Sequence, residues 1–200
     1  MFDQDAFRSA LGSFVTGVTI VTARGPDGEP VGLTANSFNS VSLDPPMVLW
    51  SLALSSNSLP VFRDAESWAV HILAAGQEDL SQRFATSGLD KFTGLGDRNG
   101  PADGPEGAPL IEGCAARFGC RARFEYEGGD HAIFLGEVVD FDRSRAEPLI
   151  YHGGRYGRVA SGGARDEDAL LLAGLAEETA NGLRLTEAGR AQLELLASLS

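Results

Sequence analysis

"RARFEYEGGDHAIFLGEVVDF", residues 121–141, is a run of alternating polar and apolar side chains interrupted once by "EGGD". The alternation assigns Ala122, Phe124 and Tyr126 to one face and Arg121, Arg123 and Glu125 to the other. A period of two is typical of a strand with one buried face, and a glycine pair between two such runs is typical of a tight turn. The sequence therefore predicts a β-hairpin, and with it an antiparallel sheet.

Further strand-like runs, rich in β-branched and aromatic residues, lie around this hairpin. They are residues 15–24, 31–38, 47–54, 67–73 and 148–159, the last adding one short strand. Helices are few and brief: one ends near Gly12, one has Pro60 in its first turn, and one lies within residues 77–86. Short strands separated by turns favour an antiparallel barrel or sandwich over repeated βαβ units, so we expect a mainly β fold.

Two segments, residues 87–109 and residues 160–200, lack the strand-like pattern. Residues 87–109 are rich in glycine and proline from Gly94 onward and predict a long exposed loop, a kind of loop that is often functional. Residues 160–165 predict a linker, followed by helical segments at 166–178 and 185–199. The sequence therefore predicts a domain over residues 1–160 and a C-terminal helical extension over 161–200.

Composition and charge exclude several classes of protein. The formal charge of −12 disfavours non-specific binding to nucleic acid. Neither a signal peptide nor an apolar run of the roughly 20 residues that span a bilayer is found, so we expect a cytoplasmic protein that does not enter membranes. The two cysteines, Cys114 and Cys120, do not make a disulfide framework, and we expect buried free thiols within strands.

Several catalytic motifs are missing. There is no Gly-x-Gly-x-x-Gly after a strand, no Walker A lysine motif, no His-Glu-x-x-His and no Gly-x-Ser-x-Gly elbow. The three histidines, His71, His131 and His152, are far apart in the sequence, so no metal site is expected. An enzyme with this sequence would therefore borrow its reactivity from a cofactor.

Residues 31–58 carry two clusters of short polar side chains on either side of an apolar strand. The first is "TANS" at 34–37, and the second is "SSNS" at 55–58. Such residues either form turns or hold a polar ligand; Asn39 and Asn57 in particular suit turns. Serine hydroxyls at the start of a helix suit a phosphate group, while Ser58 alone also suits an ordinary helix N-cap.

A series of short motifs in this order carries a resemblance. They are "FVTGVTIVTA", "GLTANSF", "SLDPP", "LSSNS", "LSQRFA", "DKF", "GDHAIFLGEV" and "PLIYHGGRYG". From Phe7 to Val159 the chain resembles the short-chain flavin reductases, the reductase components of two-component flavin-dependent monooxygenases. The resemblance implies an antiparallel, Greek-key split β-barrel of the FMN-binding type, with a homodimer and flavin near its interface. It also implies hydride transfer from NADH or NADPH to FMN or FAD, and a monooxygenase partner that receives reduced flavin.

The resemblance also implies the residues of the site. The strand residues Thr34, Ala35, Asn36 and Ser37 would meet the polar edge of the isoalloxazine, with Phe38 as a wall. The ribityl and phosphate groups would lie against Ser51, Leu52, Ser55, Ser56 and Ser58, with Arg83 as counter-charge, Phe84 nearby, and Lys91 and Phe92 folded over the flavin. His131 would be the catalytic residue beside the nicotinamide, with Arg155 and Tyr156 near the mouth of the site. A solvated Arg83 and a hairpin His131 that points to water are the alternatives.

Two rival functions stay open at this point. One is an FMN-binding redox carrier or sensor without efficient NAD(P)H turnover, and the other is an interaction module without flavin. Residues 181–196 resemble the wing and last helix of a MarR-type winged-helix domain, which some flavin reductases carry as a regulatory extension. The segment is too short for a complete winged helix, and we expect it to pack on the barrel or on a dimer partner. Its excess of acidic residues argues against DNA binding.

Overall fold

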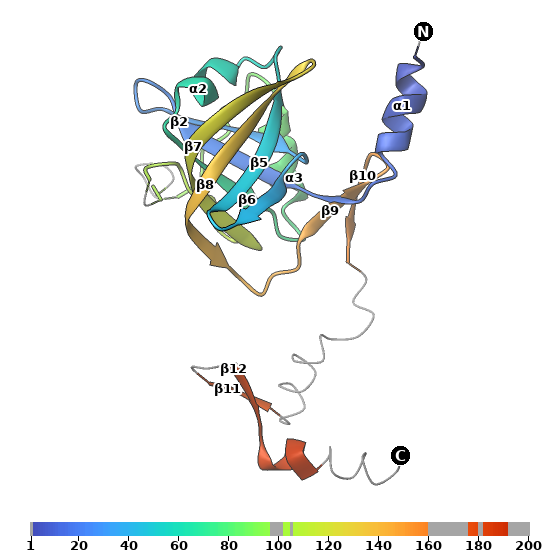
Figure 1. Cartoon of the computed structure of the whole chain (residues 1–200), viewed down its shortest axis with the longest axis vertical. Coiled ribbons are helices and arrows are strands. Elements are labelled where there is room, and N and C mark those ends of the chain that lie inside the picture. Colours follow the sequence, from blue (N-terminus) through green and yellow to red (C-terminus); the bar gives the residue numbers. More distant parts are fainter. Residues whose placement is uncertain (1, 97–101, 105, 160–175, 180–181, 192–200) are drawn as a thin grey trace. The chain divides into compact units, whose positions relative to one another are not determined.

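The computed structural model describes residues 2–96, 102–104, 106–159, 176–179 and 182–191. The chain divides into two compact units, Met1–Val159 and Ala160–Ser200. The first unit is built on a seven-stranded antiparallel sheet with the strand order β3-β2-β6-β7-β8-β5-β4 (Figure 1). Its strands are β2 (Thr19–Arg24), β3 (Pro30–Ala35), β4 (Asn39–Leu43), β5 (Pro46–Ala53), β6 (Ser67–Ile72), β7 (Ala116–Gly128) and β8 (His131–Arg143).

A smaller sheet and three short helices complete the first unit. The sheet consists of β1 (Thr16–Gly17), β9 (Leu149–His152) and β10 (Arg155–Arg158) in the order β1-β9-β10. The helices are α1 (Gln4–Leu11), α2 (Leu59–Asp64) and α3 (Glu78–Ala85). The predicted mainly β, antiparallel architecture with few short helices is thus confirmed. No helix in the described part of the chain is long and apolar enough to span a bilayer.

Strand β2 is buried on both faces, which divides the apolar interior into two clusters. Val21 and Ala23 face a core that holds Trp50 and Trp68, the two tryptophans, and into which α2 inserts Phe62. The other face belongs to a second cluster, whose members are Val18, Ile20, Leu73, Phe84, Phe92, Ile111, Cys114 and Leu149. Because the second cluster includes residues of α3 and of the segment after it, apolar burial holds that segment against the sheet.

The hairpin formed by β7 and β8 is confirmed, but one detail of its faces was predicted wrongly. The pairing register shifts between Ala122 and Phe124, which marks a β-bulge at Arg123. An extra residue in one strand moves all following side chains to the opposite face. Ala122 therefore packs against the core, while Phe124 and Tyr126 are 53% and 52% exposed and stack with ring centroids 6.1 Å apart.

The segment 148–159 also differs from its prediction. It contains two strands, β9 and β10, rather than one. Gly153 and Gly154 lie between them with φ angles of 55° and 80°, a backbone conformation that glycine adopts without strain.

The two cysteines are free and buried, as predicted, but Cys114 precedes β7 instead of lying in a strand. Burial raises the pKa of both thiols to about 12. Both cysteines therefore stay protonated and unreactive at neutral pH.

The second unit corrects the prediction of a purely helical extension. Strands β11 (Ala176–Thr179) and β12 (Gly182–Leu185) pair as an antiparallel hairpin, and a helix follows from residue 187. The predicted helix 166–178 is therefore wrong over residues 176–178, and its first part, 166–175, lies outside the described residues. The end of the second predicted helix, from residue 192 onward, also lies outside them. Arg184 pairs with Glu177 across the hairpin at 2.6 Å, a contact that the helical prediction could not include.

Candidate active site

A pocket of about 610 Å³ lies beside β3, an edge strand of the large sheet. Three further elements complete it: the end of β5, the turn before α2, and the segment after α3. Its lining residues are 30–34, 52–53, 55–58, 84–85 and 87–92. An edge strand leaves part of its backbone N–H and C=O groups without a strand partner. The pocket therefore combines short polar side chains and backbone groups with an apolar wall, and its volume suits a cofactor-sized ligand.

The apolar wall depends on the absence of a side chain at Gly32. A Cβ atom at this position would lie 2.7 Å from Cε1 of Phe84 and 3.1 Å from Cζ of Phe92. The two phenylalanine rings instead contact each other edge to face, with centroids 5.0 Å apart, directly on β3. Gly32 thus allows two buried aromatic rings to pack closely against the strand at the base of the pocket.

The turn from β5 into α2 presents the second polar cluster to the pocket. The backbone N–H of Ser56 donates to the carbonyl of Ala53 at 2.9 Å, which turns the chain at the end of β5. Ser58 occupies the predicted N-cap position of α2, but its side chain makes no capping hydrogen bond. Its backbone N–H donates to Oγ of Ser56 at 3.3 Å. The turn therefore leaves the hydroxyl of Ser58 available to a ligand.

Lys91 supplies positive charge to the pocket. Its ammonium group donates to the carbonyls of Gly32 at 3.1 Å and Phe84 at 2.8 Å, which uses two of its three N–H donors. Burial lowers the pKa of Lys91. The carboxyl group of the neighbouring Asp90 accepts hydrogen bonds from the hydroxyl and backbone of Thr93 and from the backbone of Phe92, which hold it on its own loop. These hydrogen bonds lower the pKa of Asp90. Lys91 is therefore the charged side chain in the pocket that favours an anion.

The structure brings some of the predicted site residues together. Those that line the pocket are Thr34, Leu52, Ser55, Ser56, Ser58, Phe84 and Phe92. They come from segments that are up to about 60 positions apart in the sequence, which the antiparallel topology unites at one edge of the sheet. Asp90 and Gly32 were not among the predicted site residues, because neither a small nor an acidic residue points by itself to this site.

Several polar groups of the first cluster form hydrogen bonds within the protein and are not available to a ligand. The hydroxyl of Ser37 accepts from the backbone N–H of Ser51 at 2.9 Å and donates to the carbonyl of Ser51 at 3.1 Å. The carbonyl of Ala35 accepts from the hydroxyl of Thr19 at 2.7 Å, and Phe38 stacks on a neighbouring ring at 5.6 Å. These three predicted residues and Ser51 lie outside the lining set, as does the exposed Asn36.

Three predicted residues near α3 and β10 also lie outside the lining set. Arg83 donates to the carbonyl of Thr93 at 3.1 Å. The hydroxyl of Tyr156 makes hydrogen bonds with the side chains of Ser81 and Gln82, both at 2.9 Å. Arg155 is exposed on β10. Tyr156 therefore holds α3 in place from outside the pocket lining.

His131, the first residue of β8, lies outside the lining set but beside it along the sheet. The register of the sheet pairs it with Ala53, which is itself a lining residue. Its side chain is 43% exposed, and Nδ1 lies 2.7 Å from a carboxylate oxygen of Asp130. This hydrogen bond lowers the pKa of Asp130. The pairing fixes one ring nitrogen and leaves the other free to contact a molecule at the rim.

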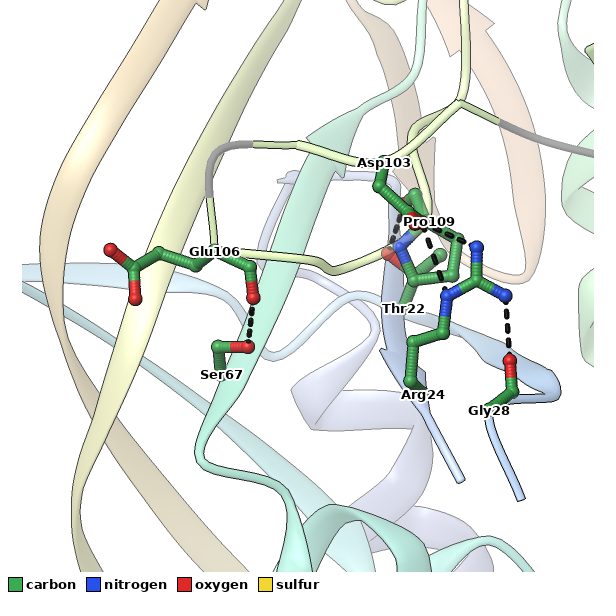
Figure 2. Close-up of polar contacts among 7 residues, drawn as sticks. All are labelled: Thr22, Arg24, Gly28, Ser67, Asp103, Glu106 and Pro109. Atoms are coloured by element: carbon green, nitrogen blue, oxygen red, sulfur yellow. Dashed lines mark hydrogen bonds and ion pairs between the residues drawn. The ribbon is translucent and has the colours of Figure 1, made fainter. Parts of the chain in front are cut away.

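The long loop that the sequence predicts as exposed is in part tied to the sheet. Figure 2 shows three attachments from β2 and β6: Arg24 forms an ion pair with Asp103, the hydroxyl of Thr22 donates to Pro109, and the hydroxyl of Ser67 donates to Glu106. Both hydroxyls donate to backbone carbonyl oxygens, each at 2.6 Å. These bonds anchor residues 102–104 and 106–109, whereas residues 87–92 of the same connection line the pocket.

Comparison with known proteins identifies a family and several relatives that this chain resembles. The family described as "Flavin reductase like domain" matches residues 11–160. The chain is 47% identical over 158 residues to the FMN reductase (NADH) SmoA of Agrobacterium fabrum (strain C58). This match covers 78% of this chain and 86% of that protein. It is 43% identical over 149 residues to the reductase component of the flavin-dependent trigonelline monooxygenase of Acinetobacter baylyi, covering 74% of this chain and 47% of that protein.

A solved structure agrees with these relatives. The NADH:FAD oxidoreductase SgcE6 of Streptomyces globisporus C-1027, in complex with NAD and FAD fragments, matches with a TM-score of 0.75 and 41% sequence identity. The match covers 81% of this chain and 96% of that one. With the family match over residues 11–160, these similarities show that the chain belongs to the flavin reductase family.

Proposed function

We propose that this protein is an NADH-dependent flavin reductase that transfers hydride to FMN or FAD and supplies reduced flavin to a partner monooxygenase. The observation that carries the proposal is the composition of the pocket wall. The buried side chains of Phe84, Phe92 and Leu52 form the apolar base of the pocket, while Lys91 and the serines of 55–58 offer charge and donors for a phosphate. Family membership and the names of the relatives support the same activity.

The residues fit a flavin by chemistry as well as by space. A bound flavin supplies the acceptor for a two-electron hydride transfer, which no side chain of the pocket provides. The protein's part is to bind the flavin, orient it and keep one face open to the nicotinamide. The third N–H of Lys91 and the free hydroxyls of Ser55 and Ser58 would hold the phosphate, and Thr34 would meet a polar group of the flavin.

His131 is proposed as the residue that orients the nicotinamide. Its pairing with Ala53, a lining residue, supports a position beside the opening of the pocket. Asp130 holds Nδ1, so Nε2 faces outward as a hydrogen-bond partner for the carboxamide of NADH. The side chain would thus set the approach of the donor carbon and leave flavin binding to other residues.

The assembly of the protein is also part of the proposal. We propose a barrel closed between the β3 and β5 sides by the hydrogen bonds of Ser37 to Ser51, and a homodimer of such barrels. Exposed apolar side chains support the dimer: Phe7 and Leu11 of α1 are 50% and 59% exposed, and α1 has no buried residue. We also propose that the protein works in the cytoplasm.

The second unit is proposed to act as a lid or effector element on the reductase unit. Its hairpin and following helix agree in order with the wing and last helix that its sequence resembles. Deletion of residues 162–200 should then change the oligomeric state or the kinetics. If both stay the same, the proposed role is wrong.

The activity is tested by anaerobic mixing of the purified protein with NADH or NADPH and, in turn, FMN, FAD and riboflavin. We expect rapid loss of the flavin absorption band with NADH. Tight flavin binding without such bleaching would identify a redox carrier or sensor and overturn the reductase proposal. Failure to bind any flavin would favour an interaction module.

A further inference from the structure

The hydroxyl of Thr34 has a fixed hydrogen-bonding direction. It donates to the backbone carbonyl of Ser81 at 2.7 Å. A threonine hydroxyl carries one proton and two acceptor lone pairs. Because its proton is committed to Ser81, Thr34 can act only as an acceptor toward a ligand in the pocket that it lines.

This direction depends on the position of α3, which is held from its other side by Tyr156. Ser81 is fully buried, and its hydroxyl lies 2.9 Å from the hydroxyl of Tyr156. The amide of Gln82 donates to the same Tyr156 oxygen at 2.9 Å. The Tyr156 ring in turn contacts Tyr151 edge to face, with centroids 5.5 Å apart. A continuous chain of contacts thus runs from β10 through α3 to β3.

We propose that Thr34 determines the specificity of the pocket by accepting a hydrogen bond from an N–H or O–H group of the ligand. Ser81 and Tyr156 are positioning residues that fix this polarity. The inference rests on the proposed flavin site and deepens it. A flavin offers two kinds of donor, the imide N3–H of its ring and the hydroxyls of its ribityl chain. The other hydroxyl of the first cluster, on Ser37, is bonded to Ser51 on both its donor and acceptor sides.

The test compares dissociation constants for riboflavin, 3-methylriboflavin and lumiflavin by fluorescence quenching. Methylation removes the imide donor, and lumiflavin lacks the ribityl donors. We expect the wild-type protein to prefer riboflavin over one of these analogues by roughly 3- to 10-fold, the effect of one neutral hydrogen bond. Thr34→Val should abolish that preference and Thr34→Ser should retain it. The analogue whose discrimination disappears identifies the donor.

Tyr156→Phe and Ser81→Ala test the positioning residues. We expect the preference to fall to an intermediate value in both, because α3 loses its support. Tyr151→Phe is the matched control, since its hydroxyl takes no part in this chain of hydrogen bonds, and it should keep the wild-type preference. A merely structural role would lower the thermal midpoint while the preference stays unchanged.

The outcomes separate the inference from the proposed function. If the wild-type protein binds riboflavin and Thr34→Val leaves both discriminations unchanged, the inference is wrong and the flavin site stands. If Thr34→Val abolishes the preference for riboflavin and the Tyr156 and Ser81 variants leave it unchanged, the positioning role is wrong. If the wild-type protein binds none of the three flavins, the proposed function fails and the inference fails with it.

Discussion

The polar clusters at residues 34–37 and 55–58 are alike in composition but differ in what their hydroxyl groups contact. Thr34 and Ser37 of the first cluster are hydrogen-bonded to α3 and β5. In the second cluster Ser55 is exposed, and Ser58 makes no side-chain capping bond. The difference follows from location, because a strand end must join neighbouring elements, whereas a turn need satisfy only itself. In this protein the hydroxyls of the first cluster are therefore largely committed to the fold and keep only the acceptor side of Thr34 for a ligand, whereas the hydroxyls of Ser55 and Ser58 are free.

The largest effect is expected at Gly32, in the strand that carries the first cluster. Gly32→Val would push into the rings of Phe84 and Phe92, because even a Cβ atom lies 2.7 Å from Phe84. We expect a loss of flavin binding beyond detection and a fall in stability of about 1–3 kcal/mol, measured by titration and by urea unfolding. Gly17→Ala is the control, since nothing lies within 4 Å of a Cβ there. Unchanged flavin binding in Gly32→Val would contradict the proposed aromatic wall.

Lys91 adds positive charge to the pocket that the second cluster and Thr34 line. Lys91→Met should weaken FMN binding by roughly 10- to 100-fold, the effect of one charge-assisted hydrogen bond, and leave riboflavin binding nearly unchanged. Arg155→Met is the control, because Arg155 is exposed on β10 and outside the pocket lining. An equal loss for FMN and riboflavin would show that Lys91 acts on the loop and not on a phosphate.

Lys91 also predicts a pH dependence. Burial lowers the pKa of Lys91 below that of a free lysine. The ammonium charge is complete at low pH and is lost as the pH rises through this lowered pKa. FMN affinity in the wild-type protein should therefore start to fall at a lower pH than an exposed lysine would give, while riboflavin affinity stays constant. Lys91→Met should show no such fall.

His131 tests whether the rim next to the second cluster serves the nicotinamide. His131→Ala should lower kcat/KM for NADH by about 10-fold, which corresponds to one lost hydrogen bond in the transition state. The dissociation constant for FMN should stay within twofold of the wild-type value. Stopped-flow reduction and flavin titration measure the two quantities. Unchanged turnover would remove His131 from the site.

Ser37 tests the structural side of the comparison. Ser37→Ala would leave the backbone N–H and carbonyl of Ser51 without their partner. We expect a loss of about 1–3 kcal/mol in the free energy of unfolding, with flavin binding affected only through stability. Denaturant unfolding and flavin titration at low temperature separate the two. A fully stable variant with lost flavin binding would reverse the roles assigned to the clusters.

The smallest effect is expected in the second cluster itself. Ser55→Ala should leave the free energy of unfolding unchanged within about 0.5 kcal/mol, because the side chain is exposed. FMN binding should weaken by roughly 2- to 10-fold through loss of one donor to the phosphate, with riboflavin unaffected. If stability falls as much as in Ser37→Ala, the two clusters do not differ in the proposed way.

Local patterns in the sequence predicted the fold, since each depends on neighbours along the chain. The period of two in 121–141 predicted the β7–β8 hairpin, and α3 lies within the helix predicted for residues 77–86. The bulge at Arg123 was not predictable in this way, because a shift of pairing register depends on the partner strand. The extension was predicted as helical from its leucines and glutamates, but residues 176–179 and 182–185 pair with each other as strands.

The site was predictable in its composition but not in its connections. The ordered motifs indicated Thr34 of the first polar cluster, the second polar cluster and Phe92, which do line the pocket. The bonds of Ser37 to Ser51 and of Tyr156 to Ser81 join residues far apart in the sequence, so no local pattern reveals them. Lys91 was noted only beside Phe92, because nothing in the sequence shows that its ammonium group faces the carbonyls of Gly32 and Phe84.

The attachment of the long loop has a consequence for how this protein can diverge. Thr22 and Ser67 on the sheet donate to the backbone carbonyls of Pro109 and Glu106, and every amino acid supplies a carbonyl at those positions. The ion pairs Arg24–Asp103 and Arg121–Glu106 depend instead on side chains of the loop. The two hydroxyl bonds are thus encoded in the strands alone and survive any change of side chain at residues 106 and 109. Substitutions in the loop can therefore alter this outer surface, and even remove its ion pairs, while the loop keeps part of its hold on the sheet.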